Sequence, residues 1–159
     1  MADPAAQPAS AGDAHADDPP LPIDVATHFL DLLAAKDIDA ASDLLAGNVE
    51  YVNVGLPAVH SRERVQRLLQ ASLRPAGAGF EVYMHAIAAN GPSVLTERTD
   101  VLTFRRLRIQ FWVCGRFDVN DGQIVLWRDY FSGAKFITAT LRGLLGVAVP
   151  AVRAKPPTI

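Results

Sequence analysis

The chain has few of the residues that build covalent or metal-linked frameworks. It contains one cysteine, Cys114, in 159 residues, which excludes a disulfide scaffold. Its four histidines stand too far apart for a recognisable metal-ligand motif. We therefore expect no metal site, and the single cysteine fits a reducing compartment, so we expect a cytoplasmic protein.

Charge is also scarce. Charged residues make up 20% of the chain, and 15 Lys and Arg against 17 Asp and Glu give a net charge of −2. This balance does not favour a nucleic-acid binder. The chain does not open on a basic segment followed by an apolar run, so no secretory signal is expected. The longest apolar-rich stretch, Phe136 to Val149, contains Arg142 and is shorter than the ~20 residues of a spanning helix, so no membrane span is expected.

Apolar residues, by contrast, make up half of the chain. Residues 1–21 are rich in Ala, Pro and Asp and cannot build a core, so they are expected to form a disordered tail. Residues 22–150 are expected to form a single domain, and residues 151–159 a loose C-terminal tail. The apolar surplus therefore belongs to one domain and needs a place within it.

Three helices are expected in the first half of this domain. Apolar residues follow helical spacing from residue 22 onwards. Asp39 stands where it would cap a second helix that presents Leu44 and Leu45, and Ser61 stands where it would cap a third. A further helix is expected from about residue 135 to residue 149, ended by Pro150.

Strands dominate the second half. One early strand, Glu50 to Gly55, places Tyr51 and Asn53 on the same face. Beyond residue 80 the apolar period is two, which is typical of strands, and short turn sequences divide the region. The predicted strands are Phe80–Ala89, Ser93–Phe104, Leu107–Val119 and Gln123–Phe131. These four form an antiparallel meander, and helices followed by a sheet indicate an α+β fold with a pocket between the two layers.

Charged residues interrupt the apolar rows of this meander. The last strand has Val125, Trp127 and Phe131 on one face, with Asp129 among them. A charge on a core-facing row is costly unless it is paired, and Arg98 in the second meander strand is the available partner.

The register of the strands brings the two charges together. Hairpins that are symmetric about their turns set Arg98 opposite Val113, and Val113 opposite Asp129. Asp100 lies on the same side as Arg98. An Arg-x-Asp pair alone is usually a structural ion pair, whereas two carboxylates around one arginine are also an acid/base arrangement. From the residues alone, the structural and the catalytic interpretations stand about equal.

Three motifs carry a resemblance to a known family. Tyr51-x-Asn53-x-Gly55, Arg98-Thr99-Asp100 and Trp127-Arg128-Asp129-Tyr130-Phe131 resemble the limonene-1,2-epoxide hydrolase family, especially its mycobacterial-type members. The similarity extends over nearly everything after the N-terminal tail. It implies a curved, mixed but mainly antiparallel sheet with helices packed into its concave face, of the NTF2-like or SnoaL-like kind. It also implies a homodimer with an apolar pocket and no metal or organic cofactor.

The resemblance further implies an activity, that of an ether-bond hydrolase adding water to an apolar, terpene-like or cyclic epoxide in one step to give a vicinal diol. Asp129 would be the general base for a water molecule that Tyr51 and Asn53 also hold. Asp100 would be the general acid, and Arg98 would bridge the two carboxylates. The residues expected to line the substrate pocket are Val82, Met84, Leu102, Phe111, Val113, Trp127 and Phe131.

Two other functions stay open at this point. A SnoaL-like isomerase or cyclase also places an aspartate in an apolar pocket, but it does not require the whole set of two aspartates, an arginine and a Tyr/Asn pair. A non-catalytic module that binds apolar ligands would have no turnover for a substitution of Asp129 to abolish.

Overall fold

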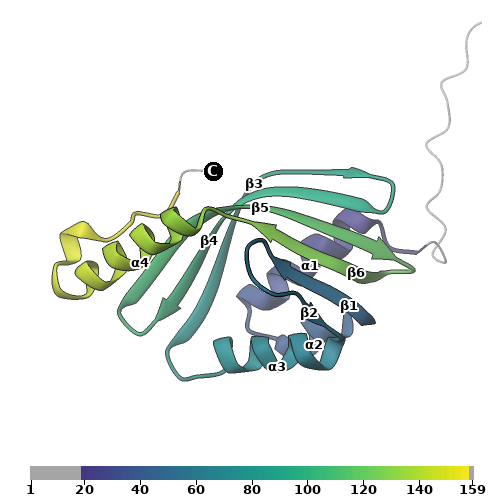
Figure 1. Ribbon diagram of the computed structural model, residues 1–159, viewed down its shortest axis with the longest axis horizontal. Helices are drawn as coiled ribbons and strands as arrows, with labels where there is room; N and C mark the ends of the chain where they lie inside the picture. Colours follow the sequence, from purple (N-terminus) through teal and green to yellow (C-terminus); the bar gives the residue numbers. More distant parts are fainter. Residues whose placement is uncertain (1–18, 158–159) are drawn as a thin grey trace, which may run out of the picture.

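A computed structural model describes residues 19–157, and it shows one curved sheet with helices against it (Figure 1). Most of the predicted N-terminal tail, residues 1–21, lies outside the described residues. The elements in chain order are α1 (Pro22–Ala34), α2 (Ile38–Asp43), β1 (Leu45–Asn53), β2 (Val59–His60), α3 (Arg62–Leu73), β3 (Ala78–Asn90), β4 (Ser93–Phe104), β5 (Leu107–Asn120), β6 (Gln123–Tyr130), α4 (Gly133–Ala148) and a 3-10 turn, η1 (Pro150–Val152). No helix among the described residues is long and apolar enough to cross a membrane.

The six strands lie in the order β2-β1-β6-β5-β4-β3. Strands β3 to β6 form the predicted antiparallel meander, and β1 joins β6 in parallel. The sheet is therefore mixed but mainly antiparallel, and α1, α2 and α3 lie together on one side of it (Figure 1). The predicted α+β fold class and the covering of one face by helices are confirmed.

The second helix and the first strand differ from the prediction. Helix α2 ends at Asp43, and Leu45, which was expected in the helix, begins β1 instead. Leu45 is fully buried and pairs with Ile124 of β6. Pairing with a strand almost eighty residues away outweighs the local helical pattern, so β1 is longer at its N-terminal end than predicted.

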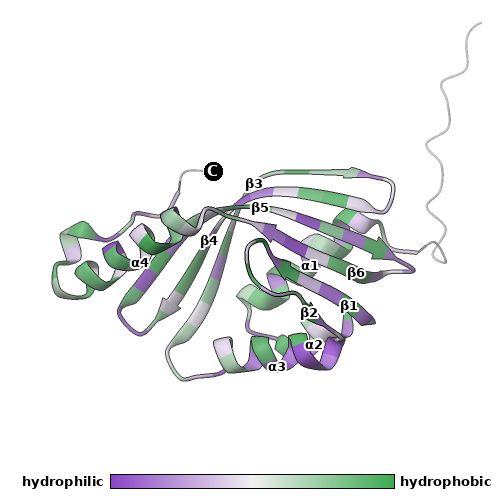
Figure 2. Cartoon of the chain, viewed as in Figure 1, coloured by the Kyte–Doolittle hydropathy of each residue, from purple (hydrophilic) through white to green (hydrophobic). Residues whose placement is uncertain are grey.

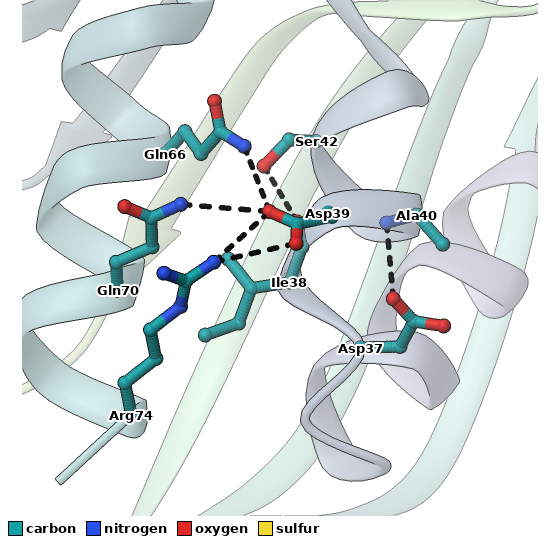
Figure 3. Close-up of polar contacts among 8 residues, drawn as sticks. All are labelled: Asp37, Ile38, Asp39, Ala40, Ser42, Gln66, Gln70 and Arg74. Carbon is teal, nitrogen blue, oxygen red and sulfur yellow. Dashed lines mark hydrogen bonds and ion pairs between the residues drawn. The ribbon is translucent and has the colours of Figure 1, made fainter.

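The cap of α2 is also a correction. Asp37, not Asp39, accepts the capping hydrogen bond, from the backbone N–H of Ala40 at 3.1 Å (Figure 3). Asp39 instead accepts hydrogen bonds from the side chains of Gln66 and Gln70 in α3 and of Arg74, its C-cap residue (Figure 3). Because these donors recur every four residues on one face of α3, Asp39 joins α2 to α3. Ser61 does occupy the N-cap position of α3, but its side chain makes no capping hydrogen bond there.

The register of the meander is confirmed at one point and corrected at another. Arg98 pairs with Val113 as predicted, but Asp129 pairs with Gly115 rather than with Val113. The β5–β6 register shifts between Val119 and Asp118 of β5, so that Val125 becomes an extra residue in β6. Ile124, not Val125, is therefore the buried residue at this point of the inward row.

The core lies between α1 and the meander. Phe29 of α1 contacts the rings of Phe117 and Trp127 edge-on, with centroids 6.1 Å and 5.0 Å away. All three side chains are buried. Aromatic pairs in this geometry add to the free energy of their burial and fix how α1 sits on the sheet.

Helix α4 lies apart from the other helices. It packs along β5, at the end of the strand that β6 does not reach, and Figure 2 shows hydrophobic residues along most of its length. The predicted loose tail, residues 151–159, begins inside η1. Arg142 donates a hydrogen bond to the carbonyl oxygen of Val152, and Arg153 donates one to that of Gly146. Residues 150–153 are thus held against α4.

Candidate active site

A buried arginine stands at the centre of the inward face of the sheet. Arg98 is 0% exposed, and its neighbours Asp100 and Asp129 are 4% and 5% exposed. The Arg98 Nε donates to Oδ1 of Asp100 at 2.9 Å, and Nη2 donates to Oδ1 of Asp129 at 2.6 Å. Strand alternation puts Arg98 and Asp100 on one face of β4, and the β5–β6 register puts Asp129 on the same face two strands away. The structure therefore brings together the three charges that the sequence singled out.

Two further residues contact this arginine, and the sequence analysis did not select them. Thr96, also buried, accepts a hydrogen bond from Nη1 of Arg98 at 2.9 Å. Gly115 lies beneath the guanidinium, where a Cβ atom would overlap Nη1. Two features of the sequence could have indicated these residues. Gly115 is the one break in the apolar row of β5, and Thr96 lies two residues before Arg98 on the same face of β4.

Tyr51 and Asn53 reach this place through the parallel pairing of β1 with β6. Asn53 pairs with Asp129 and Tyr51 with Trp127. The Asn53 amide donates to the Tyr51 hydroxyl at 2.6 Å, and the Tyr51 ring lies on Trp127 with centroids 4.1 Å apart. The parallel register therefore places both polar side chains at the edge of the buried charges.

A cavity of about 730 Å³ opens beside these residues. Tyr51, Asn53, Asp100 and Asp129 contribute to its lining, whereas Arg98 does not. Helix α3, the loop after β1 and helix α4 provide most of the remaining wall. The apolar side chains from these segments are Val54, Leu56, Leu68, Leu69, Leu73, Phe136 and Ile137. The sequence leaves open whether Phe136 and Ile137 close the pocket or a dimer contact, and it does not single out the other five, because helix packing decides which of them face the cavity.

Five of the seven predicted pocket residues do line the cavity: Leu102, Phe111, Val113, Trp127 and Phe131. The other two, Val82 and Met84 of β3, do not. Their side chains pack against the core cluster instead, because α1 covers the part of β3 from which they project. They are therefore corrected to core-packing residues.

The charge states of the site follow from burial and from the arginine. Burial raises the pKa of Asp100 to about 6; Arg98 opposes this shift and the charge of Asp129 adds to it. Burial also raises the pKa of Asp129 against the opposing effect of Arg98. The pKa of Arg98 is raised, because the two carboxylates outweigh the opposing effect of its burial. Burial, followed by the charge of Asp129, raises the pKa of Tyr51 and keeps its hydroxyl protonated.

The site thus has the parts of an acid/base catalyst. It holds two carboxyl groups with one guanidinium between them, beside a phenol and an amide, at the wall of an apolar cavity. Within residues 19–157, no group of three or more His, Cys, Asp or Glu side chains is arranged to hold a metal ion. Such a set can accept a proton at one carboxylate and donate one from the other.

Comparisons with known proteins show which family and which relatives the chain resembles. A family model described as the limonene-1,2-epoxide hydrolase catalytic domain matches residues 20–142. The chain is 45% identical over 127 residues to the epoxide hydrolase EphG of Mycobacterium tuberculosis, covering 79% of this chain and 83% of that protein.

Two solved structures share the fold. A structure of an M. tuberculosis LEH-like epoxide hydrolase superposes with a TM-score of 0.79 at 41% identity, covering 85% of this chain and 95% of that one. A putative ketosteroid isomerase from Kribbella flavida shares the fold, with a TM-score of 0.58 at 17% identity, over 86% of this chain and 82% of its own.

The raised pKa of Asp100 predicts a pH dependence of stability. The folded protein binds the Asp100 proton more tightly than the unfolded chain, in which the pKa is about 3.9. The contribution of this group to the free energy of unfolding is therefore fully present below about pH 4 and is lost as the pH rises towards about 6.

Asp100→Asn should remove this dependence, because an amide stays neutral while its oxygen still accepts the Arg98 N–H. Urea unfolding of both proteins between pH 4 and pH 7 should show the wild type losing stability relative to the variant as the pH rises. Parallel stability curves would contradict the assignment of a raised pKa to Asp100.

Proposed function

The chain belongs to the limonene-1,2-epoxide hydrolase family and is an epoxide hydrolase, and we propose that it adds water directly to an apolar epoxide to give a vicinal diol. The observation that carries this proposal is the buried Asp100–Arg98–Asp129 set at the wall of an apolar cavity. Family membership sets aside the isomerase, cyclase and binding-module alternatives.

Asp129 is proposed as the general base. Its Oδ1 accepts from Arg98, which leaves Oδ2 for a water proton. Asn53 donates one N–H to the Tyr51 oxygen, so the Tyr51 hydroxyl proton, the Asn53 side-chain oxygen and its second N–H are left to hold that water. A water molecule bound by these three side chains would face the cavity with its nucleophilic oxygen positioned for attack.

Asp100 is proposed as the general acid. A pKa of about 6 leaves part of the protein with this carboxyl protonated at neutral pH, which an ordinary aspartate would not provide. In the reaction, the water oxygen bonds to an epoxide carbon as the ring C–O bond breaks. The water proton goes to Asp129 and the Asp100 proton goes to the ring oxygen, so a later transfer from Asp129 to Asp100 restores the starting state.

The lining of the cavity supports an apolar substrate. Besides the site residues, the polar side-chain groups among its described lining residues are the Ser72 hydroxyl, which is bonded within α3 to the Leu68 carbonyl, and the Trp127 indole N–H. Exposed apolar side chains also contribute to the lining, among them Leu56 and Ile137. A terpene-like or cyclic epoxide could therefore bind without leaving polar groups of its own unpaired, apart from the epoxide oxygen.

Epoxide hydrolysis with defined variants tests this proposal. The protein should convert at least one of limonene oxide, cyclohexene oxide and styrene oxide to its diol. Asp129→Asn and Asp100→Asn should each lower kcat by ~10²-fold or more, because each removes one proton-transfer group. Asp118→Asn is a matched control, because Asp118 pairs with Arg116 away from the cavity lining. No diol from any epoxide offered, or full activity of both aspartate variants, would contradict the proposal.

Direct attack by water makes a separate isotopic prediction. In a single turnover in ¹⁸O-water, one labelled oxygen should appear in the diol and none in the protein. Mass spectrometry of the peptide containing Asp129 provides the second measurement. Label in the Asp129 carboxylate would show that an enzyme ester forms and would contradict the one-step mechanism.

We also propose that the enzyme is a homodimer. Helix α4 exposes the large apolar side chains of Ile137, Leu141, Leu144 and Leu145, and such a patch commonly marks a protein contact. Light scattering at micromolar concentration should give a mass near twice the 17.1 kDa of the chain. Leu141→Lys should shift the mass towards the monomer, and a monomeric wild type would contradict the proposal.

A further inference from the structure

Arg98 has a third hydrogen bond besides the two to the carboxylates. Its guanidinium lies along β4, with Nε on Asp100 and Nη1 on the Thr96 hydroxyl at 2.9 Å. Thr96 is 2% exposed and does not belong to the cavity lining. Because a β-branched side chain in a strand is restricted at χ1, the Thr96 oxygen is a fixed acceptor for the guanidinium.

The space that the guanidinium occupies exists because Gly115 has no side chain. Gly115 pairs with Thr96 on one side and with Asp129 on the other. A Cβ atom there would overlap Arg98 Nη1 and lie 2.6 Å from the Thr96 Oγ1 and 3.1 Å from the Asp129 Oδ1. Gly115 does not have a positive φ, so the backbone conformation does not require glycine here. The position requires glycine because a side chain would occupy the space of the guanidinium.

We infer that Thr96 is a positioning residue for the hydrolysis. Its hydroxyl accepts from Arg98 and holds the guanidinium above Gly115, in the orientation in which Nε donates to Asp100 and Nη2 donates to Asp129. This inference rests on the proposed roles of the two aspartates. Because Thr96 does not line the cavity, it acts on the reaction through Arg98.

Loss of the Thr96 hydroxyl leaves the Nη1 N–H buried without this acceptor. Asp129 Oδ1 already accepts from Nη2 at 2.6 Å, so we expect the guanidinium to turn towards this carboxylate. The bond from Nε to Asp100 then lengthens, and the ionised form of Asp100 loses support. The charged and titratable groups that face Asp100 are Arg98, Asp129 and Tyr51, while its strand neighbours Val82 and Phe111 are apolar.

Thr96→Val tests the inference, because valine keeps the shape and branching of threonine and removes the acceptor. We expect kcat to fall about ten- to a hundredfold, as for loss of a hydrogen bond to a charged group, with KM changed little. The alkaline limb of the kcat profile should move to higher pH, because Asp100 then holds its proton more tightly. Thr96→Ser, which restores the hydroxyl, should recover most of the activity.

A matched control lies three residues away on the same strand. Thr99 is also buried, but its hydroxyl hydrogen-bonds to His85 on the opposite face, so Thr99→Val should leave kcat and its pH profile unchanged. If Thr96→Val does not fold by circular dichroism, Thr96→Ser against Thr96→Ala makes the same comparison, because these two differ only in the hydroxyl.

A readout without turnover separates this inference from the proposed function. Carboxyl ¹³C NMR titration should show a higher pKa for Asp100 in Thr96→Val than in wild type, and no change in Thr99→Val. If Thr96→Val matches wild type in kcat, pH profile and Asp100 titration while both aspartate variants are inactive, Thr96 has no positioning role. If the aspartate variants stay active, that result contradicts the proposed function, on which this inference rests.

Discussion

Complete burial of the Arg98 guanidinium is the constraint on which the rest of the site depends. Removing such a charge from water costs several kcal/mol unless charged and polar acceptors replace the water. Here Thr96, Asp100 and Asp129 replace it, from two strands with β5 between them. Strand β5 must therefore have no side chain at the point where the guanidinium crosses it, and Gly115 is the residue at that point. The ring of Phe117, 5.9 Å from the guanidinium carbon, adds a favourable contact with the cation.

The same constraint explains why the site can perform acid chemistry. One guanidinium and two carboxylates would carry a net charge of −1 in a place that water hardly reaches. One proton bound by either carboxyl would restore neutrality, and burial accordingly raises the pKa of both groups even though Arg98 opposes the shift. An isolated Arg–Asp pair would already be neutral and would have no reason to hold a proton. The second carboxylate thus turns a structural ion pair into a group that can donate one.

Local periodicity was enough to predict the four strands of the meander and the shared face of Arg98 and Asp100, because alternation in a strand depends only on the chain itself. It could not reach features that depend on distant segments. The parallel pairing of β1 with β6, which brings Asn53 beside Asp129, joins strands separated by most of the domain. Likewise, Leu68 and Ile137 line the cavity only because of how α3 and α4 pack.

The register of Asp129 shows how a wrong detail can leave a correct conclusion. A hairpin symmetric about Asp121 would pair Asn120 with residue 122, but Asn120 pairs with Gln123. This shift of one residue alone would turn the Asp129 side chain to the face opposite Arg98. The extra residue Val125 adds a second offset of one, and two such offsets together return Asp129 to the inward face. The bulge is therefore required by the site: without it, the buried guanidinium would lose its 2.6 Å acceptor, and the cavity would lose its proposed base.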